Sequence, residues 1–244
     1  MSFERFKTNL FDIFSRNSDL PTLDEEKCQK LYELTEIMLE VNKSMNLTAI
    51  TEEKAVILKH YVDSLTVSRF IPEGVRVLDV GCGAGFPTLP LAIFHPDLKI
   101  LALDGTAKRI EYVKATASKL GLINVSAISA RAEELAQKPE YRESFEVVTA
   151  RAVASLPVLT ELCLPFCKVG GCFLAMKASS AEDELSAANN AIKLCGGKLV
   201  EKTTLDLTAD GVSFERRNII CISKAESTPK QYPRHYSKIS KKPL

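Results

Sequence analysis

Residues 77–92 read Val-Leu-Asp-Val-Gly-Cys-Gly-Ala-Gly-Phe-Pro-Thr-Leu-Pro-Leu-Ala. A short apolar run is followed by three glycines, at positions 81, 83 and 85, and then by an apolar segment of helical character. This order predicts a strand, a tight turn and a helix, in which glycine lets a ligand lie against bare backbone. A dinucleotide-binding loop would have its third glycine at position 86, which is Phe86. The loop therefore favours a smaller nucleoside cofactor, with S-adenosylmethionine as the obvious candidate.

A second apolar run, residues 98–104, ends in Asp104, which follows Gly85 by 19 residues. An acid near this offset accepts hydrogen bonds from ribose hydroxyls in nucleotide-binding folds. Thr106 reads as the N-cap of a helix that runs to Leu120 and stops at Gly121. Asp104 is equally compatible with helix capping, and a glycine loop alone is also typical of ordinary turns. Both interpretations stay open at this point.

Composition places the chain among globular proteins, with 244 residues, 45% apolar and 26% charged. It contains no run of 18 uncharged apolar residues and no secretory leader, so we expect a cytoplasmic protein without a membrane span. The seven cysteines are spread as reduced, buried thiols would be. Cys163 and Cys167 lie four apart, but no histidine is near them in sequence, so no metal site is predicted.

Three regions follow one another along the chain. Residues 1–72 form a helical N-terminal extension in which Thr22 and Glu25 make a capping box and a second helix spans about 52–70. Residues 73–226 alternate strand and helix, which predicts a Rossmann-like α/β domain with a mostly parallel seven-stranded sheet. Residues 227–244 form a basic tail. The expected strands are 75–80, 98–104, 124–129, 145–150, 171–176, 198–204 and 217–223, and the clearest helices are 106–120 and 180–195.

The ends of the expected strands carry the candidate site, because ligands bind at the carboxyl ends of parallel strands. The third strand is followed by Ala132 and Glu133, where an acid could reach an adenine amino group. The fourth ends in Arg151 and the fifth in Lys177. No Asn-Pro-Pro-Tyr sequence, cysteine nucleophile, Ser-His-Asp order or His-Glu-x-x-His sequence accompanies them. The site is therefore expected to act by positioning and electrostatics.

The chain's last 21 residues are unevenly charged, with six Lys or Arg against one acid, Glu226. Tyr232 and Tyr236 are interleaved with them. Three interpretations are open: a solvated tail, an arm that contacts phosphates, or a segment in which Tyr232-Pro233-Arg234 folds back onto the core. The arm interpretation gives five candidate RNA contacts, Lys230, Arg234, Lys238, Lys241 and Lys242.

Motifs along nearly the whole chain resemble, in order, one family: the bacterial small-subunit ribosomal RNA guanine-N7 methyltransferases, also called the glucose-inhibited division protein B family. The matching stretches are residues 45–50 (MNLTAI), 59–65 (KHYVDSL), the glycine loop through Pro87, 108–110 (KRI), 131–135 (RAEEL), 150–156 (ARAVASL), 174–177 (LAMK), 232–234 (YPR) and 242–244 (KPL). The chain departs from the family at Thr88, usually Gly, at Gly105-Thr106, usually Ser-Leu, and at 235–240, which lack the usual Gly-x-Pro.

The resemblance implies a class I S-adenosylmethionine-dependent methyltransferase that acts on a guanine of 16S ribosomal RNA near the decoding site. Its partner would be the 30S subunit, and we expect a monomer without metal. The cofactor contacts carried over by motif are Gly81, Phe86, Ala132, Glu133 and Arg151. The residue-level interpretation adds Gly83, Gly85 and Asp104, with Gly105 and Thr106. Candidates for positioning the substrate are Arg151, Lys177 and His60.

Guanine N7 carries a lone pair and no proton, so its methylation needs no general base. That chemistry suits a site without a nucleophile, in which alignment of the reactants supplies the rate. Two other classes remain to be distinguished. One is a nicotinamide-dependent oxidoreductase, which the loop spacing disfavours. The other is a ribosome-assembly factor that retains the fold without catalysis, which the intact glycine loop and Asp104 disfavour.

Overall fold

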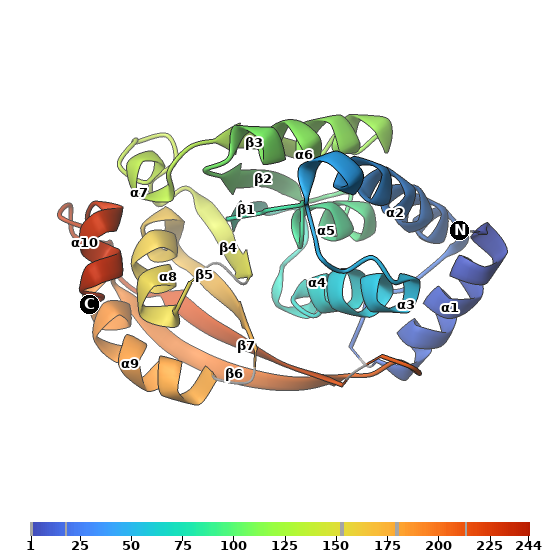
Figure 1. Cartoon of the computed structure of the whole chain (residues 1–244). Helices are drawn as coiled ribbons and strands as arrows, with labels where there is room; N and C mark the ends of the chain where they lie inside the picture. The colour runs from blue at the N-terminus through green and yellow to red at the C-terminus, as the bar shows by residue number, and fades with distance from the viewer. Residues whose placement is uncertain (1, 18, 152–153, 179–180, 213) are drawn as a thin grey trace.

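The computed structural model describes residues 2–17, 19–151, 154–178, 181–212 and 214–244. These residues form a seven-stranded sheet in the order β3-β2-β1-β4-β5-β7-β6 (Figure 1). All neighbouring strands from β3 to β5 are parallel, and β7 runs antiparallel to both β5 and β6. The predicted mostly parallel α/β sheet is confirmed. The strands are β1 (Arg76–Val80), β2 (Lys99–Asp104), β3 (Val125–Ser129), β4 (Phe145–Arg151), β5 (Cys167–Lys177), β6 (Gly197–Leu207) and β7 (Glu215–Lys224).

Alternate residues of the strands supply two apolar cores, one on each face of the sheet. Val77, Ile100 and Val147 pack with the helices of the first face, whereas Leu78 and Val148 pack with those of the second. The first face is covered by α1 (Phe3–Arg16), α2 (Glu25–Met45), α5 (Thr88–Phe94) and α6 (Ala107–Lys119). The second is covered by α7 (Ala132–Leu135), α8 (Leu156–Cys163), α9 (Ala181–Leu194) and α10 (Tyr236–Lys241). Period-two burial on both faces is the mark of a doubly wound sheet.

The N-terminal helices share the first core with the sheet, because Phe6, Leu31 and Met38 belong to the same buried cluster as Val77. The division of the chain at residue 72 stays a prediction. The expected capping box at Thr22 is wrong. Helix α2 begins at Glu25, and the Asp24 carboxylate accepts a hydrogen bond from the Lys27 amide at 2.9 Å. Asp24 lies directly before the first helical residue, where an N-cap side chain can reach the amides of the first turn.

The helix expected over residues 52–70 is broken into four short pieces. It starts as α3 (Glu53–Val56), widens into the π-helical turn η1 (Ile57–Val62) and continues as α4 (Asp63–Leu65) and the 3₁₀ turn η2 (Ser68–Phe70). Single π turns occur often at functional sites, because the extra residue re-aims neighbouring side chains. Here the turn contains His60 and leads directly into Asp63.

The C-terminal segment is folded onto the second core, so the solvated-tail interpretation is wrong. Tyr232 and Ile239 are buried, and Lys224 is fully buried with its ammonium donating to the Leu164 carbonyl at 2.8 Å. The Arg142 guanidinium donates to the Tyr232 carbonyl at 3.0 Å. Figure 1 shows α10 beside α7 and α8, on the face of the sheet that these helices cover. Among the described helices, none has the length and apolarity that crossing a membrane requires.

Candidate active site

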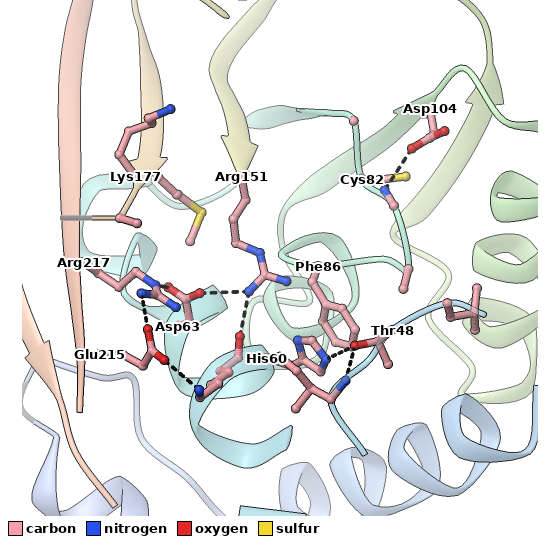
Figure 2. A pocket seen from close by; sticks show the side chains of 18 of the residues that line it. Thr48, His60, Asp63, Cys82, Phe86, Asp104, Arg151, Lys177, Glu215 and Arg217 are labelled. Carbon is pink, nitrogen blue, oxygen red and sulfur yellow. Dashed lines mark hydrogen bonds and ion pairs between the residues drawn. The ribbon is translucent and has the colours of Figure 1, made fainter. Parts of the chain in front are cut away.

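A pocket of about 780 Å³ lies beside the glycine loop, at the carboxyl end of the parallel strands. It opens where strand order reverses between β1 and β4, the place where open α/β sheets bind ligands. Figure 2 shows Asp104 on one side of it and the paired side chains of Asp63, Arg151 and Arg217 on the other. The sequence-predicted residues that line it are Gly81, Gly83, Phe86, Asp104, His60, Arg151 and Lys177.

The glycine loop is held open by its backbone and by one carboxylate. Gly81, Gly83 and Gly85 have φ angles of 74°, 55° and 84°, which other residues rarely adopt. Asp104 Oδ2 accepts from the Gly83 amide at 3.1 Å, and Oδ1 accepts from the Thr106 amide at 2.8 Å. The two interpretations of Asp104 are therefore compatible. It fixes the amide of Thr106, the residue directly before α6, and also lines the pocket, and a carboxylate has room for further donors such as ribose hydroxyls.

Gly83 and Gly85 differ in what lies next to them, which gives a first prediction. A Cβ on Gly83 would meet only the Gly81 carbonyl oxygen, at 3.9 Å, whereas one on Gly85 would lie 2.6 Å from Leu89 Cδ1. Gly85 does not line the pocket, because it faces helix α5. We expect Gly83→Ala to cost about 1 kcal/mol of stability, the strain of the left-handed conformation. Gly85→Ala should cost about 1–3 kcal/mol more through overpacking against Leu89. Urea unfolding of both variants measures the difference, and equal losses would contradict the packing role of Gly85.

A buried carboxylate lies beneath the loop. Asp79 of β1 accepts from the Thr88 hydroxyl at 2.6 Å and from the Thr149 hydroxyl at 3.1 Å. Burial raises the pKa of Asp79 to about 6, against the opposing effect of the two hydroxyls. The Thr88 hydroxyl thus supplies a hydrogen bond that glycine at this position could not. The contact fixes the start of α5 to the strand that enters the loop.

Aromatic rings form a wall on the side of the N-terminal helices. His60 stacks on Phe86 with ring centroids 4.4 Å apart and an interplanar angle of 7° (Figure 2). His60 Nε2 lies 3.0 Å from the Thr48 hydroxyl, and Nδ1 has no hydrogen-bond partner among the described residues. Burial, together with the nearby Arg151 charge, lowers the pKa of His60 to about 3. The ring is therefore neutral near pH 7, keeps one N–H and contributes a flat surface to the pocket.

An ionic cluster faces this wall. Arg151 Nη1 donates to Asp63 Oδ2 at 3.0 Å and to the Lys59 carbonyl at 2.9 Å. Asp63 Oδ1 lies 3.1 Å from Arg217 Nε, so one carboxylate holds two guanidinium groups (Figure 2). Glu215 pairs with Lys59 at 2.6 Å and with Arg217 at 2.8 Å. The side chains in the cluster fix one another, which prepares the arginines to orient a ligand.

Lys177, at the end of β5, is placed by a second set of contacts. Its ammonium donates to the Ala154 carbonyl at 2.8 Å and pairs with Glu184 of α9 at 2.7 Å. The same Glu184 carboxylate accepts from the Leu156 amide at 2.7 Å. These contacts join Ala154 and Leu156 to Lys177 and Glu184, and the last two residues line the pocket. Ala152 and Val153 of the family-like stretch 150–156, and Ser180 of the expected helix 180–195, lie outside the described residues.

Arg217 and Glu215 are site residues that the strand-end rule missed. Both line the pocket from the beginning of β7, not from its end. Because β7 is antiparallel to β5, its first residues lie at the carboxyl end of the parallel strands. The signal was present, since the expected strand 217–223 begins with an arginine. Using it requires knowing the direction of the last strand.

Several predicted cofactor residues lie beside the pocket and do not line it: Gly85, Gly105, Thr106, Ala132 and Glu133. Thr106 is the N-cap residue of α6, and the buried Glu133 belongs to the short helix α7. Gly105 lies against the Arg131 guanidinium, which is 3.4 Å from the Glu133 carboxylate. Gly105 and Thr106 follow β2, Ala132 and Glu133 follow β3, and the contact of all five residues with a cofactor stays a prediction.

The described residues hold no group of three or more His, Cys, Asp or Glu side chains that could bind a metal ion. The Cys167 thiol lies 3.7 Å from the Cys163 carbonyl oxygen, so Cys167 is a donor to the backbone. All seven cysteines are free.

Solved structures that share this fold include methyltransferases that depend on S-adenosylmethionine. A SAM-dependent methyltransferase from Aquifex aeolicus aligns over 76% of this chain and 97% of that chain, with a TM-score of 0.54 and 16% identity. A SAM-dependent O-methyltransferase from Thermotoga maritima covers 79% of this chain and 73% of that one, with a TM-score of 0.52 and 15% identity. The chain has the class I S-adenosylmethionine-dependent methyltransferase fold.

Sequence comparison defines the family. The model of GidB, rRNA small subunit methyltransferase G, matches residues 27–210. Ribosomal RNA small subunit methyltransferase G of Limosilactobacillus reuteri is 47% identical over 228 residues, 91% of this chain and 93% of that protein. The protein of the same name from Clostridium novyi is 37% identical over 246 residues and covers both chains completely. The chain belongs to the rRNA small subunit methyltransferase G family.

Proposed function

We propose that this protein transfers the methyl group of S-adenosylmethionine to N7 of a guanine in 16S ribosomal RNA, acting in the cytoplasm, as a monomer, on the small ribosomal subunit. The observation that carries the proposal is one pocket in which the glycine loop and Asp104 face the cluster of Asp63, Arg151 and Arg217. Family membership supports the class of reaction and of substrate.

The residues present fit the cofactor. The open backbone at Gly83 leaves room for a ligand against the main chain, and the Asp104 carboxylate suits a ribose diol. Bound S-adenosylmethionine supplies a methyl group on a positively charged sulfur. The protein then has to bind the guanine, exclude water and align N7 with that methyl group, and alignment alone can supply several kcal/mol.

The ionic cluster suits an RNA substrate. Arg151, Lys177 and Arg217 offer donors for phosphate and guanine oxygen atoms, and the stacked His60 and Phe86 rings offer an apolar surface for a base. Asp63, Glu184 and Glu215 lie among these cations.

The deciding experiment uses 30S subunits that lack the modification, purified protein and methyl-labelled S-adenosylmethionine. We expect one methyl group per particle, recovered as 7-methylguanosine by nucleoside mass spectrometry. Label in another nucleoside would overturn the assignment to N7. Binding of the particle without any transfer would indicate an assembly factor, and cofactor titration with a reduced nicotinamide dinucleotide tests the oxidoreductase alternative.

The pH dependence of the reaction checks the absence of a general base. His60 stays neutral between pH 6.5 and 8.5, because its pKa is lowered to about 3. Asp79, whose pKa is raised to about 6, is predominantly ionised above pH 6.5. The single-turnover rate on assembled particles should therefore change by less than about threefold over this range. A tenfold rise per pH unit that disappears in a variant of one titratable residue would identify that residue as a base.

The exposed lysines of the C-terminal segment give a separate prediction. Lys238, Lys241 and Lys242 are exposed on or beside α10, as is Lys230 before it. If the first three contact phosphates, replacing them with alanine should lower the slope of log affinity for 30S against log salt by about 2 to 3, roughly 0.7–0.9 per contact. Filter binding at several salt concentrations measures the slope. An unchanged slope would remove these lysines from the RNA interface.

A further inference from the structure

The C-terminal helix reaches the cofactor side of the pocket through one arginine. The Arg131 guanidinium lies over the Tyr236 ring of α10, 4.7 Å from its centroid. The same guanidinium lies against Gly105, where an added Cβ would be 3.5 Å from Arg131 Nη1. Gly105 directly follows Asp104, which lines the pocket. The Tyr236 ring of the C-terminal helix thus fixes the Arg131 guanidinium at the edge of the predicted nucleoside site.

We propose that Tyr236 is a positioning residue of the cofactor site, which holds Arg131 over the Gly105 backbone so that the guanidinium covers the adenine end of the cofactor. A guanidinium is planar, stacks on aromatic rings and donates in a fixed geometry. Arg131 is half exposed, with 50% of its side chain accessible, and it pairs with Glu133 at 3.4 Å, so without the ring its long side chain would sample more conformations in solvent. Stacking on Tyr236 removes that freedom before the cofactor arrives, which lowers the entropic cost of binding.

The helix that carries Tyr236 is fixed by contacts that do not involve this tyrosine. Ile239 of α10 is fully buried. Arg234 holds the buried Glu161 with three donors, and Gln137 donates to the Pro233 carbonyl at 2.9 Å. Gln137 lies just after α7, in the connection between β3 and β4 that also carries Arg131. The C-terminal segment is therefore attached to that connection (Figure 1). A change at Tyr236 alone should therefore leave the segment folded.

The inference rests on the proposed use of S-adenosylmethionine and is tested by binding, without turnover. Isothermal titration calorimetry with S-adenosylhomocysteine and with adenosine is carried out on the parent, Tyr236→Ala and Tyr236→Phe. The contact between Tyr236 and Arg131 uses the ring and not the hydroxyl, so phenylalanine at position 236 should preserve the ligand affinity. We expect Tyr236→Ala to weaken binding about three- to tenfold and Tyr236→Phe to change it less than twofold. The factor should be the same for adenosine, because the contact is at the adenine end.

Two further variants distinguish the proposed role of Tyr236 from a general loosening of the fold. Arg131→Ala should weaken binding at least as much as Tyr236→Ala, and the double variant should be no weaker than Arg131→Ala, since the tyrosine acts through the arginine. The matched control is Arg76→Ala, which removes an arginine from the Phe145 ring at the same 4.7 Å, at the beginning of β1 and away from the pocket. It should leave the affinity unchanged.

The outcomes separate this inference from the proposed function. Failure of the parent protein to bind either ligand would contradict the proposed function itself. Binding by the parent with an unchanged or increased affinity in Tyr236→Ala would overturn the role of Tyr236 and leave the function intact. A loss in Tyr236→Ala that Tyr236→Phe does not rescue, or an equal loss of affinity in Arg76→Ala at a similarly lowered melting temperature, would also overturn it.

Discussion

The Arg234→Ala variant is expected to lose about 3–5 kcal/mol of unfolding free energy, although the residue lies in a basic segment near the C-terminus. Its amide and Nε donate to Glu161 Oε1 at 2.8 Å each, and Nη2 donates to Oε2 at 2.6 Å. Glu161 lies in α8 with no exposed side-chain surface. Removing the guanidinium leaves a carboxylate buried without its cation, which is the costly way to break such a pair. Urea unfolding of the full chain measures the loss.

Two controls define the origin of that loss. The exposed Lys238→Ala variant, from the same segment, should stay within about 0.5 kcal/mol of the parent. Adding Glu161→Gln to Arg234→Ala should restore part of the stability, because a neutral amide is cheaper to bury than a carboxylate. If Arg234→Ala unfolded like Lys238→Ala, the segment would be an independent arm and its charge would be available for RNA.

Sequence reasoning located the strands because their apolar runs are short and bounded by turn residues. β1 and β2, expected at 75–80 and 98–104, were found as Arg76–Val80 and Lys99–Asp104. Once the parallel order was assumed, the strand-end rule led from the glycine loop to Asp104, Arg151 and Lys177, all of which line one pocket. Local pattern and one topological rule were sufficient for these residues.

The remaining residues depend on partners that are distant in sequence. The charge of the tail is visible in the sequence, but the pairing of Arg234 with Glu161 joins positions 73 apart. Arg217 was missed because its strand runs antiparallel, and the π turn was missed because hydrophobic periodicity does not distinguish it from an ordinary helix. Ala132 and Glu133 were predicted as cofactor contacts from the family motif. In the structure the Arg131 side chain lies between Glu133 and Gly105. In each case a tertiary contact decides what the side chain does.

The second large effect is expected at the ionic cluster of the pocket, because the single carboxylate of Asp63 holds two arginines. Asp63 is buried, with 4% of its side chain exposed, and pairs with Arg151 at 3.0 Å and Arg217 at 3.1 Å. Asp63→Ala leaves two largely buried guanidinium groups without this partner, so we expect a loss of about 3–5 kcal/mol in unfolding free energy. Because misplaced positioning groups can cost about 10²-fold in rate, methyl transfer to 30S should fall by that order.

Comparison with Arg217→Ala separates stability from positioning. That variant keeps the Arg151–Asp63 pair at 3.0 Å, so it should lose less stability than Asp63→Ala while also slowing methyl transfer. Cofactor affinity should change little in either variant, because Asp104 and the glycine loop line the other side of the pocket. Unfolding free energy, cofactor affinity and single-turnover rate are measured on both proteins at one pH. A parent-like rate in Asp63→Ala would exclude the cluster from positioning the guanine. A loss of cofactor affinity as large as the loss of rate would instead place Arg151 at the cofactor, the other role that the sequence predicts for it.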